Sequence, residues 1–151
     1  MQGNQGNEQV AELDESVWVY LAANEREKDL AGVCEGFGFT VFHGGDRHTE
    51  TSGTWLEALR HADICIIELG VASTVAGAEL AMAYSSGRPL ITLRQCEEEP
   101  PGALRAMLQG HPGAREVAFE DFADCSEKLR ELLGDPTWQH LVRNATAVED
   151  F

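Results

Sequence analysis

The segment Asp63-Ile-Cys-Ile-Ile-Glu-Leu69 constrains the fold of this chain more than any other stretch. It is a continuous apolar run bounded by charged residues. Such runs are typical of central strands in parallel sheets, because helices cover both faces of a sheet of that kind. The sequence therefore predicts a buried central strand over residues 63–69.

Other strand-like runs alternate with helical segments along the chain. Four more strands are predicted over Val17–Ala22, Phe39–Phe42, Arg88–Leu93 and Arg115–Phe119. Helices are predicted over residues 25–35 (capped by Asn24), Thr54–His61, Val75–Ser86, Gly102–Gln109 and Phe122–Leu133, and loops over residues 43–53 and 95–101. This alternation predicts an α/β fold with a five-stranded parallel sheet and helices on both faces.

The length of 151 residues fits one domain. Residues 1–15 are polar and acidic, so we expect a disordered leader, followed by the folded domain over residues 16–135. Residues 136–151 form a C-terminal tail that could be helical and could pack on its own domain or on a neighbour. The leader lacks the cationic start and apolar stretch of a signal peptide, and no apolar run is long enough to cross a bilayer. We expect a cytoplasmic protein without membrane contact.

The formal net charge of −15 opposes binding of a nucleic-acid polymer. A small anion could still bind, since local cations and a helix N-terminus act at short range. The four cysteines are far apart in the sequence and form no CxxC pair, so we expect free, mostly buried thiols. Neither a metal site nor a cofactor is expected.

Ligands of open parallel sheets bind at the carboxyl ends of the strands. This rule draws attention to the loop after the third strand, which leads through Ser73 and Thr74 to Glu79. Ser73 and Thr74 can cap the following helix or offer donors to a phosphate. Glu79 lies among small residues near the start of that helix, where a carboxylate could meet a substrate. The alternative for Glu79 is a solvated or ion-paired surface side chain.

Four segments of the chain together point to a family: Val19-Tyr-Leu-Ala-Ala23, Ala62-Asp63, Gly77-Ala-Glu-Leu-Ala81 and Gly87-Arg-Pro-Leu-Ile91. In this order and spacing they resemble the nucleoside 2-deoxyribosyltransferase superfamily, and within it the 2′-deoxynucleoside 5′-monophosphate N-glycosidase and cytidylate N-glycosidase branch. The resemblance implies a flavodoxin-like (Rossmann-like) three-layer sandwich that assembles into homodimers or larger homo-oligomers. It also implies a nucleotide or nucleoside ligand and a glutamate nucleophile that attacks C1′ of the sugar and expels the base.

The resemblance assigns roles to particular residues of this chain. Glu79 falls on the nucleophile position, and Ser73 and Arg26 fall on positions near the 5′-phosphate. Arg105 replaces a second phosphate-contacting serine; it could hold a phosphate or be a surface residue. Tyr20 falls on a position that lines the pocket. Gly77, in the same motif as the nucleophile, is expected beside the substrate.

One position departs from the family pattern. The family's catalytic aspartate, eight residues before the Asp63 position, is Trp55 here. Asp46 and His48 lie in the loop after the second strand and are candidates for the missing acid; the alternative for His48 is a solvated loop histidine. Glu68 could flank the pocket from the end of the third strand. Asp63 begins a strand at the opposite end, so we expect a structural role for it.

Three functions are compatible with these residues. The first is an N-glycosidase or deoxyribosyltransferase that forms a glycosyl-glutamate intermediate, with a 5′-monophosphate as the expected substrate. The second is a degenerate relative that binds a nucleotide without cleaving it, which Trp55 would explain. The third is a related fold that uses a glutamate on NAD-like substrates.

Overall fold

The computed structural model describes residues 17–23, 27–43, 54–69, 74–97, 106 and 108–149; for residues 54–56, 74–77 and 145–149 only the backbone is described. Five strands form one parallel sheet in the order β2-β1-β3-β4-β5. They are β1 (Trp18–Ala22), β2 (Thr40–His43), β3 (Ile64–Glu68), β4 (Leu90–Gln95) and β5 (Ala114–Phe119). The predicted five-stranded parallel sheet is confirmed.

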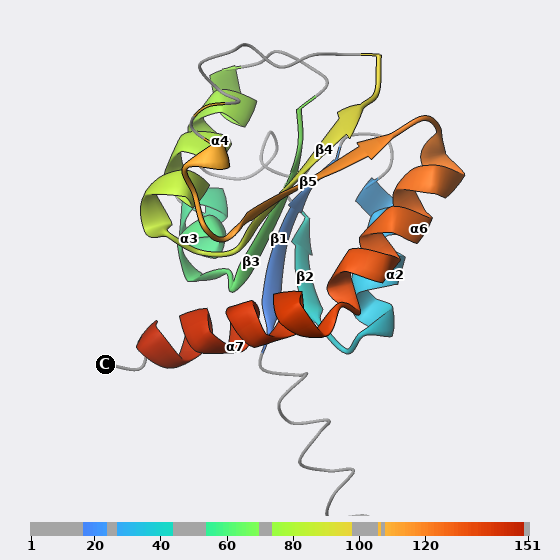
Figure 1. Ribbon diagram of the computed structural model, residues 1–151. Helices are drawn as coiled ribbons and strands as arrows, with labels where there is room; N and C mark the ends of the chain where they lie inside the picture. Colours follow the sequence, from blue (N-terminus) through green and yellow to red (C-terminus); the bar gives the residue numbers. More distant parts are fainter. Residues whose placement is uncertain are drawn as a thin grey trace, which may run out of the picture.

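Helices cover both faces of the sheet and make a three-layer sandwich (Figure 1). One layer holds α3 (Thr54–His61) and α4 (Thr74–Ser86), and the other holds α2 (Glu27–Gly36) and α6 (Phe122–Leu133). The last helix, α7 (Pro136–Glu149), crosses below the amino ends of β1 and β2 in Figure 1. The flavodoxin-like arrangement expected for the chain is confirmed. None of the helices described is long and apolar enough to cross a membrane.

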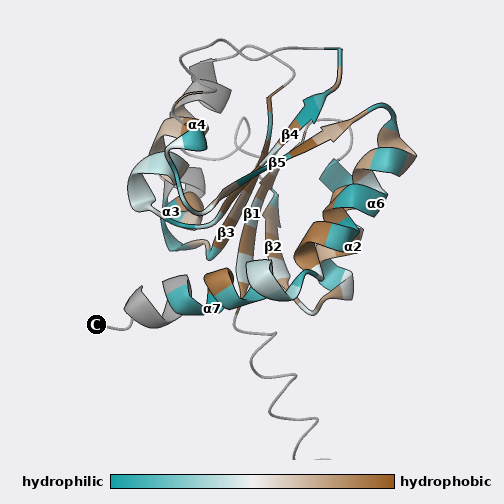
Figure 2. Cartoon of the chain, viewed as in Figure 1, coloured by the Kyte–Doolittle hydropathy of each residue, from teal (hydrophilic) through white to brown (hydrophobic). Residues whose placement is uncertain are grey.

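The core lies on the two faces of β3, whose five residues are all buried. Ile64 and Ile66 belong to the cluster beneath α2 and α6, and Cys65 and Ile67 to the cluster beneath α3 and α4. This alternation follows from the two-residue period of a strand. The hydrophobic colouring of Figure 2 runs along the central strands and the helix faces that meet them. A strand buried on both faces needs an unbroken apolar run, and residues 64–67 provide it.

The limits of β4 differ from the predicted limits. The strand begins at Leu90 rather than Arg88, because Pro89 has no backbone N–H to donate to a neighbouring strand. The Arg88 side chain donates from Nη1 to the carbonyl of Ala62. It continues to Gln95, which was predicted to begin a loop, because Gln95 pairs with Phe119 of β5. Pairing with a neighbouring strand thus extends the element past the end of its apolar run.

Two glycines end helices in a left-handed conformation. Gly38, just after α2, has φ 87°, and Gly87, just after α4, has φ 72°. The N–H of Gly87 donates to the carbonyl of Tyr84, 3.2 Å away, which closes the last turn. A side chain at either position would be strained, so glycine fits these turns.

The helix α7 follows α6 after a short turn. Asp135 accepts a hydrogen bond from the N–H of Trp138 (3.3 Å), and Pro136 occupies the first turn, where its missing N–H has no cost. Trp138 is 1% exposed and packs with Val142 against the core cluster beneath α2 and α6. Residues 136–142 are therefore part of the folded unit.

Candidate active site

Glu79 and Tyr20 meet between α4 and the sheet. The hydroxyl of Tyr20 donates to Oε2 of Glu79, and the two residues are 59 positions apart in the sequence. Both side chains are fully enclosed, with 0% of Tyr20 and 1% of Glu79 exposed. The structure thus brings together two of the residues that the sequence nominated. It excludes the alternative of a solvated surface glutamate at position 79.

The strand period and the packing of α4 on the sheet explain this meeting. Tyr20 alternates with Val19 and Leu21, so its ring faces α3 and α4 while theirs face α2 and α6. The ring stacks on Phe42 of β2, with centroids 5.6 Å apart. Leu80 and Ala83 pack α4 on the same face of the sheet, and Glu79, beside Leu80 on the buried side of this helix, reaches the phenol. Stacking holds the phenol in place, so the donor to Glu79 is preorganised.

A carboxylate in this layer carries an electrostatic cost that a hydrogen-bond donor offsets. The effect of the low-dielectric surroundings is visible at the neighbouring thiol of Cys65, which pairs with Tyr20 across the strands. Burial raises the pKa of Cys65 to about 12; the charge of Arg88 opposes this rise, and the charges of Glu79 and Asp63 add to it. The Glu79 carboxylate therefore acts in a poorly screened environment, where charge interactions are strong.

The cysteines offer a test of this interior. All four are free; Cys34, Cys65 and Cys125 are buried and Cys96 is exposed. We expect a thiol reagent at neutral pH to label Cys96 within minutes and the other three only after unfolding, because buried thiols are neutral and inaccessible. Peptide mapping of the labelled protein measures this pattern. Rapid native labelling of Cys65 would contradict the packing of α4 on the sheet.

The same thiols predict a loss of stability at alkaline pH. Burial, with a contribution from the Glu35 charge, raises the pKa of Cys34 to about 12, as burial does for Cys65. Their stabilising contribution is complete below pH 9.0, the ordinary thiol value, and is lost as pH rises from there toward about 12. The free energy of unfolding, measured with urea, should decrease from pH 8 to pH 10.5. This decrease should be smaller for a Cys34→Ala, Cys65→Ala double variant than for the parent chain.

Another polar pair, Glu27 and His43, lies at the carboxyl edge of the sheet and was not predicted from the sequence. Glu27, in the first turn of α2, accepts a hydrogen bond from the N–H of Ala23 (3.3 Å), and its other oxygen lies 3.4 Å from Nδ1 of His43. Glu27 thus ties together the ends of β1 and β2. The available signal was the spacing of Glu27 three residues after Asn24, which is that of a capping box.

Two acidic residues of the third strand lie at its opposite ends. Asp63 accepts a hydrogen bond from the N–H of Trp18 (2.8 Å) and its own N–H donates to the Trp18 carbonyl (2.8 Å), which joins the starts of β1 and β3. These bonds are consistent with the structural role expected for Asp63. Glu68 is 8% exposed at the carboxyl end of β3, and the strand period turns it toward α2 and α6.

The remaining site residues fall outside what the structure describes. These residues are the candidate acids Asp46 and His48 and the expected phosphate-binding residues Arg26, Ser73 and Arg105. The side chain of Trp55 is also outside the described part of the chain. Of Gly77 only its place in the first turns of α4 is described. Within the described residues, no group of three or more His, Cys, Asp or Glu side chains could hold a metal ion.

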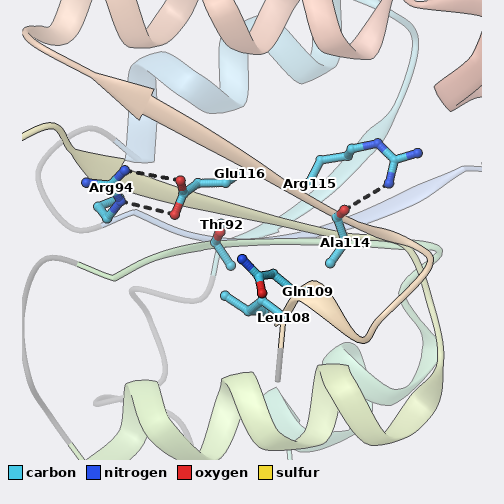
Figure 3. A pocket seen from close by; sticks show the side chains of 7 residues that line it. All are labelled: Thr92, Arg94, Leu108, Gln109, Ala114, Arg115 and Glu116. Atoms are coloured by element: carbon cyan, nitrogen blue, oxygen red, sulfur yellow. Dashed lines mark hydrogen bonds and ion pairs between the residues drawn. The ribbon is translucent and has the colours of Figure 1, made fainter. Parts of the chain in front are cut away.

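A pocket of about 450 Å³ lies elsewhere, beside β4 and β5 (Figure 3). Its lining residues are Thr92, Arg94, Leu108, Gln109, Ala114, Arg115 and Glu116. Arg94 is held there by Glu116, with Nε and Nη2 each about 3 Å from a carboxylate oxygen. Arg94 is thereby ion-paired, whereas Arg115, the other guanidinium of the lining, donates from Nη1 to the backbone carbonyls of Pro112 (3.2 Å) and Ala114 (2.8 Å). Neither Glu79 nor Tyr20 lines this pocket.

Two solved structures have an architecture similar to that of this chain. No protein-family model matches the chain, and no curated protein sequence matches it. Among solved structures, the CMP N-glycosidase BcmB of Clostridium botulinum is similar, with a TM-score of 0.62, 24% sequence identity, and coverage of 74% of this chain and 97% of that chain. The 2-deoxyribosyltransferase of Bacillus psychrosaccharolyticus has a TM-score of 0.50 and 22% identity, covering 73% of this chain and 90% of that chain. The chain thus has the fold of these two nucleoside- and nucleotide-processing enzymes.

Proposed function

We propose that this protein belongs to the nucleoside 2-deoxyribosyltransferase superfamily and cleaves the N-glycosidic bond of a nucleotide or nucleoside with Glu79 as nucleophile. The observation that carries the proposal is the buried Glu79 carboxylate, oriented by the Tyr20 hydroxyl. A buried carboxylate is costly for the fold, and such groups are concentrated at reacting centres. The fold shared with a CMP N-glycosidase supports the same activity.

The chemistry is a double displacement. One oxygen of Glu79 attacks C1′ of the sugar, the bond from C1′ to the base nitrogen breaks, and its electron pair leaves with the base. Water then attacks C1′ of the glycosyl-Glu79 ester, loses a proton and releases the carboxylate. If a second base intercepts the ester instead of water, the same enzyme is a transferase. The Tyr20 hydroxyl keeps the nucleophile in one rotamer throughout.

The substrate we propose is a 5′-monophosphate. Arg26, Ser73 and Arg105 are the residues that would hold its phosphate, since a guanidinium binds phosphate with two parallel hydrogen bonds and a serine adds a donor. CMP, named for the enzyme BcmB, is itself a monophosphate. We further propose that the protein acts in the cytoplasm as a homodimer or higher homo-oligomer.

Base release from a nucleotide panel tests this function. The purified chain is incubated with ribo- and 2′-deoxyribonucleosides and their 5′-monophosphates, and free base is measured by chromatography. We expect release from at least one monophosphate, and faster than from its nucleoside. An acid-quenched sample should carry the mass of a sugar phosphate on the peptide that contains Glu79. The absence of base release across the panel would contradict the proposal.

A nucleotide-binding protein without catalysis is the second candidate. It is favoured by the tryptophan at position 55, where the resemblance to the superfamily implies an aspartate. In that case nucleotides should raise the thermal unfolding midpoint while no base is released, because ligand binding to the native state stabilises it. Thermal shift and base release measured on the same panel separate the two functions.

A further inference from the structure

The pair formed by Glu27 and His43 has the construction of an oriented histidine. Glu27 has 11% of its side chain exposed and is anchored by the N–H of Ala23, while its second oxygen lies 3.4 Å from Nδ1 of His43. His43 has 38% of its side chain exposed. A carboxylate that faces one ring nitrogen orients the ring and holds a proton on that nitrogen, which leaves the other nitrogen to take up and release the exchangeable proton; this is the role of the third member in catalytic triads. Nε2 is therefore the nitrogen available to a ligand.

The position of His43 relates it to the Tyr20–Glu79 pair. Phe42, which stacks on Tyr20, precedes it directly, and His43 is the last residue of β2, at the carboxyl edge of the sheet. His43 is in register with Leu21 of β1, so its side chain leaves the sheet toward α2, whereas Tyr20 faces α4. A ligand in contact with both must cross the end of β1. That strand ends at Ala22 and is followed by Ala23, so the described side chains at its end are methyl groups.

The order of the strands favours such a crossing ligand. The chain leaves β1 on one side toward β2 and continues on its other side with β3, so the direction of winding reverses at β1. Ligands of doubly wound sheets bind across the strand ends at this reversal. A nucleotide bound there would have groups on both sides of β1, with its sugar at Glu79 and its base over β2.

We propose that His43, oriented by Glu27, is the general acid that protonates the departing base. The inference rests on the proposed function and supplies the acid that Trp55 cannot, since an indole N–H does not release a proton at physiological pH. An imidazolium can do so, because its ordinary pKa is close to neutrality.

Glu79 and His43 both return to their starting protonation states at the end of the catalytic cycle. As Glu79 bonds to C1′, the imidazolium gives its Nε2 proton to the base, which leaves with the electron pair of the broken bond. The neutral imidazole then takes a proton from the water that attacks the glycosyl-Glu79 ester. Glu79 returns as a carboxylate and His43 as an imidazolium. The proton on Nδ1 remains directed at Glu27 throughout.

Two substrates that differ in leaving group test the acid. One is the natural nucleotide found in the panel, whose base needs a proton; the other is the corresponding p-nitrophenyl glycoside 5′-phosphate, whose phenolate does not. We expect His43→Gln to lower kcat/KM for the nucleotide by about 10²-fold to 10⁴-fold and to leave the nitrophenyl substrate within a few-fold. Glu27→Gln should lower kcat/KM by a smaller factor and only for the nucleotide, since the His43 ring stays in place beside a weaker hydrogen-bond partner.

The chain contains a matched control for this experiment. His61 lies 3.1 Å from Glu57 on the exposed face of α3, so His61→Gln removes a histidine of another His–Glu pair. This variant should cleave both substrates at the parent rate. The pH profile gives a second readout: in the parent chain kcat/KM for the nucleotide falls as the acid deprotonates with rising pH, and in His43→Gln this fall disappears. Glu27 is the charged group that the described residues place against the His43 ring.

The outcomes separate the two proposals. If His43→Gln slows both substrates equally, or neither, His43 is not the acid, and the role of Glu79 stands. If the parent chain cleaves neither substrate, the proposed function fails and the acid role fails with it. Near-ultraviolet circular dichroism of each variant detects a loss of fold. If the His43→Gln variant is unfolded, the test is made with Glu27→Gln, which keeps an acceptor for the N–H of Ala23.

Discussion

Glutamine at position 79 is expected to abolish base release. Glu79→Gln keeps the shape of the side chain and an oxygen that accepts from Tyr20, so the enclosed layer between α4 and β1 is preserved. It removes the charge and the nucleophilic oxygen. Loss of a nucleophile typically costs about 10³-fold or more in kcat, with a residual rate from binding and orientation. Initial rates of base release, together with the thermal midpoint of the variant, measure both effects.

The matched control is Glu57→Gln. Glu57 is also a helical glutamate, but its side chain is 62% exposed and its partners are Arg60 and His61 on the same helix. Exposed ion pairs of this type contribute little to stability, so the variant should match the parent chain in rate and in thermal midpoint. Base release by Glu79→Gln at the parent rate, in a folded protein, would exclude Glu79 as the nucleophile.

The second large effect concerns the helix that ends the chain. Trp138→Ala is expected to lower the free energy of unfolding by about 3–5 kcal/mol, the usual cost of removing a large buried aromatic side chain. Trp138 is 1% exposed within the core, and the guanidinium of Arg115 lies 5.9 Å from the centre of its ring. Its truncation therefore leaves a cavity between α7 and the sheet. Urea unfolding followed by circular dichroism measures the change.

Trp18 provides the control for this prediction. It is the same residue type at the start of β1, but it is 51% exposed. Because its ring is half in water, Trp18→Ala should change the free energy of unfolding by about 1 kcal/mol or less. The bonds that its backbone makes with Asp63 do not depend on the side chain. Equal losses for the two variants would show that α7 is not packed on the core.

The site was predictable only in part. Glu79 and Tyr20 were predicted as site residues from their motif positions. Their hydrogen bond could not be predicted, because it joins residues 59 positions apart through the packing of a helix on a sheet. Glu27 and His43 were not nominated, although both are visible as ordinary residues of a helix start and a strand end. Short-range patterns report the local backbone; they do not report which side chains share an enclosed volume.

Element limits show the same division. The end of α4 was predicted correctly, because Gly87 marks it locally. The end of β4 was not, because it depends on the pairing of Gln95 with Phe119. A helix end is a property of a few consecutive residues. A strand end is set by its neighbour in the sheet.

The sequence by itself determined the class of fold, since a continuous apolar run such as residues 64–67 is stable only between two layers of helices. It also determined that a glutamate follows the third strand at the start of a helix. The tertiary structure decided that this glutamate is buried against a tyrosine, and that a second carboxylate lies beside a histidine at the end of β2. The physical reason is that burial and pairing of charges depend on the register of strands and the packing of helices, which bring together residues that no local propensity connects.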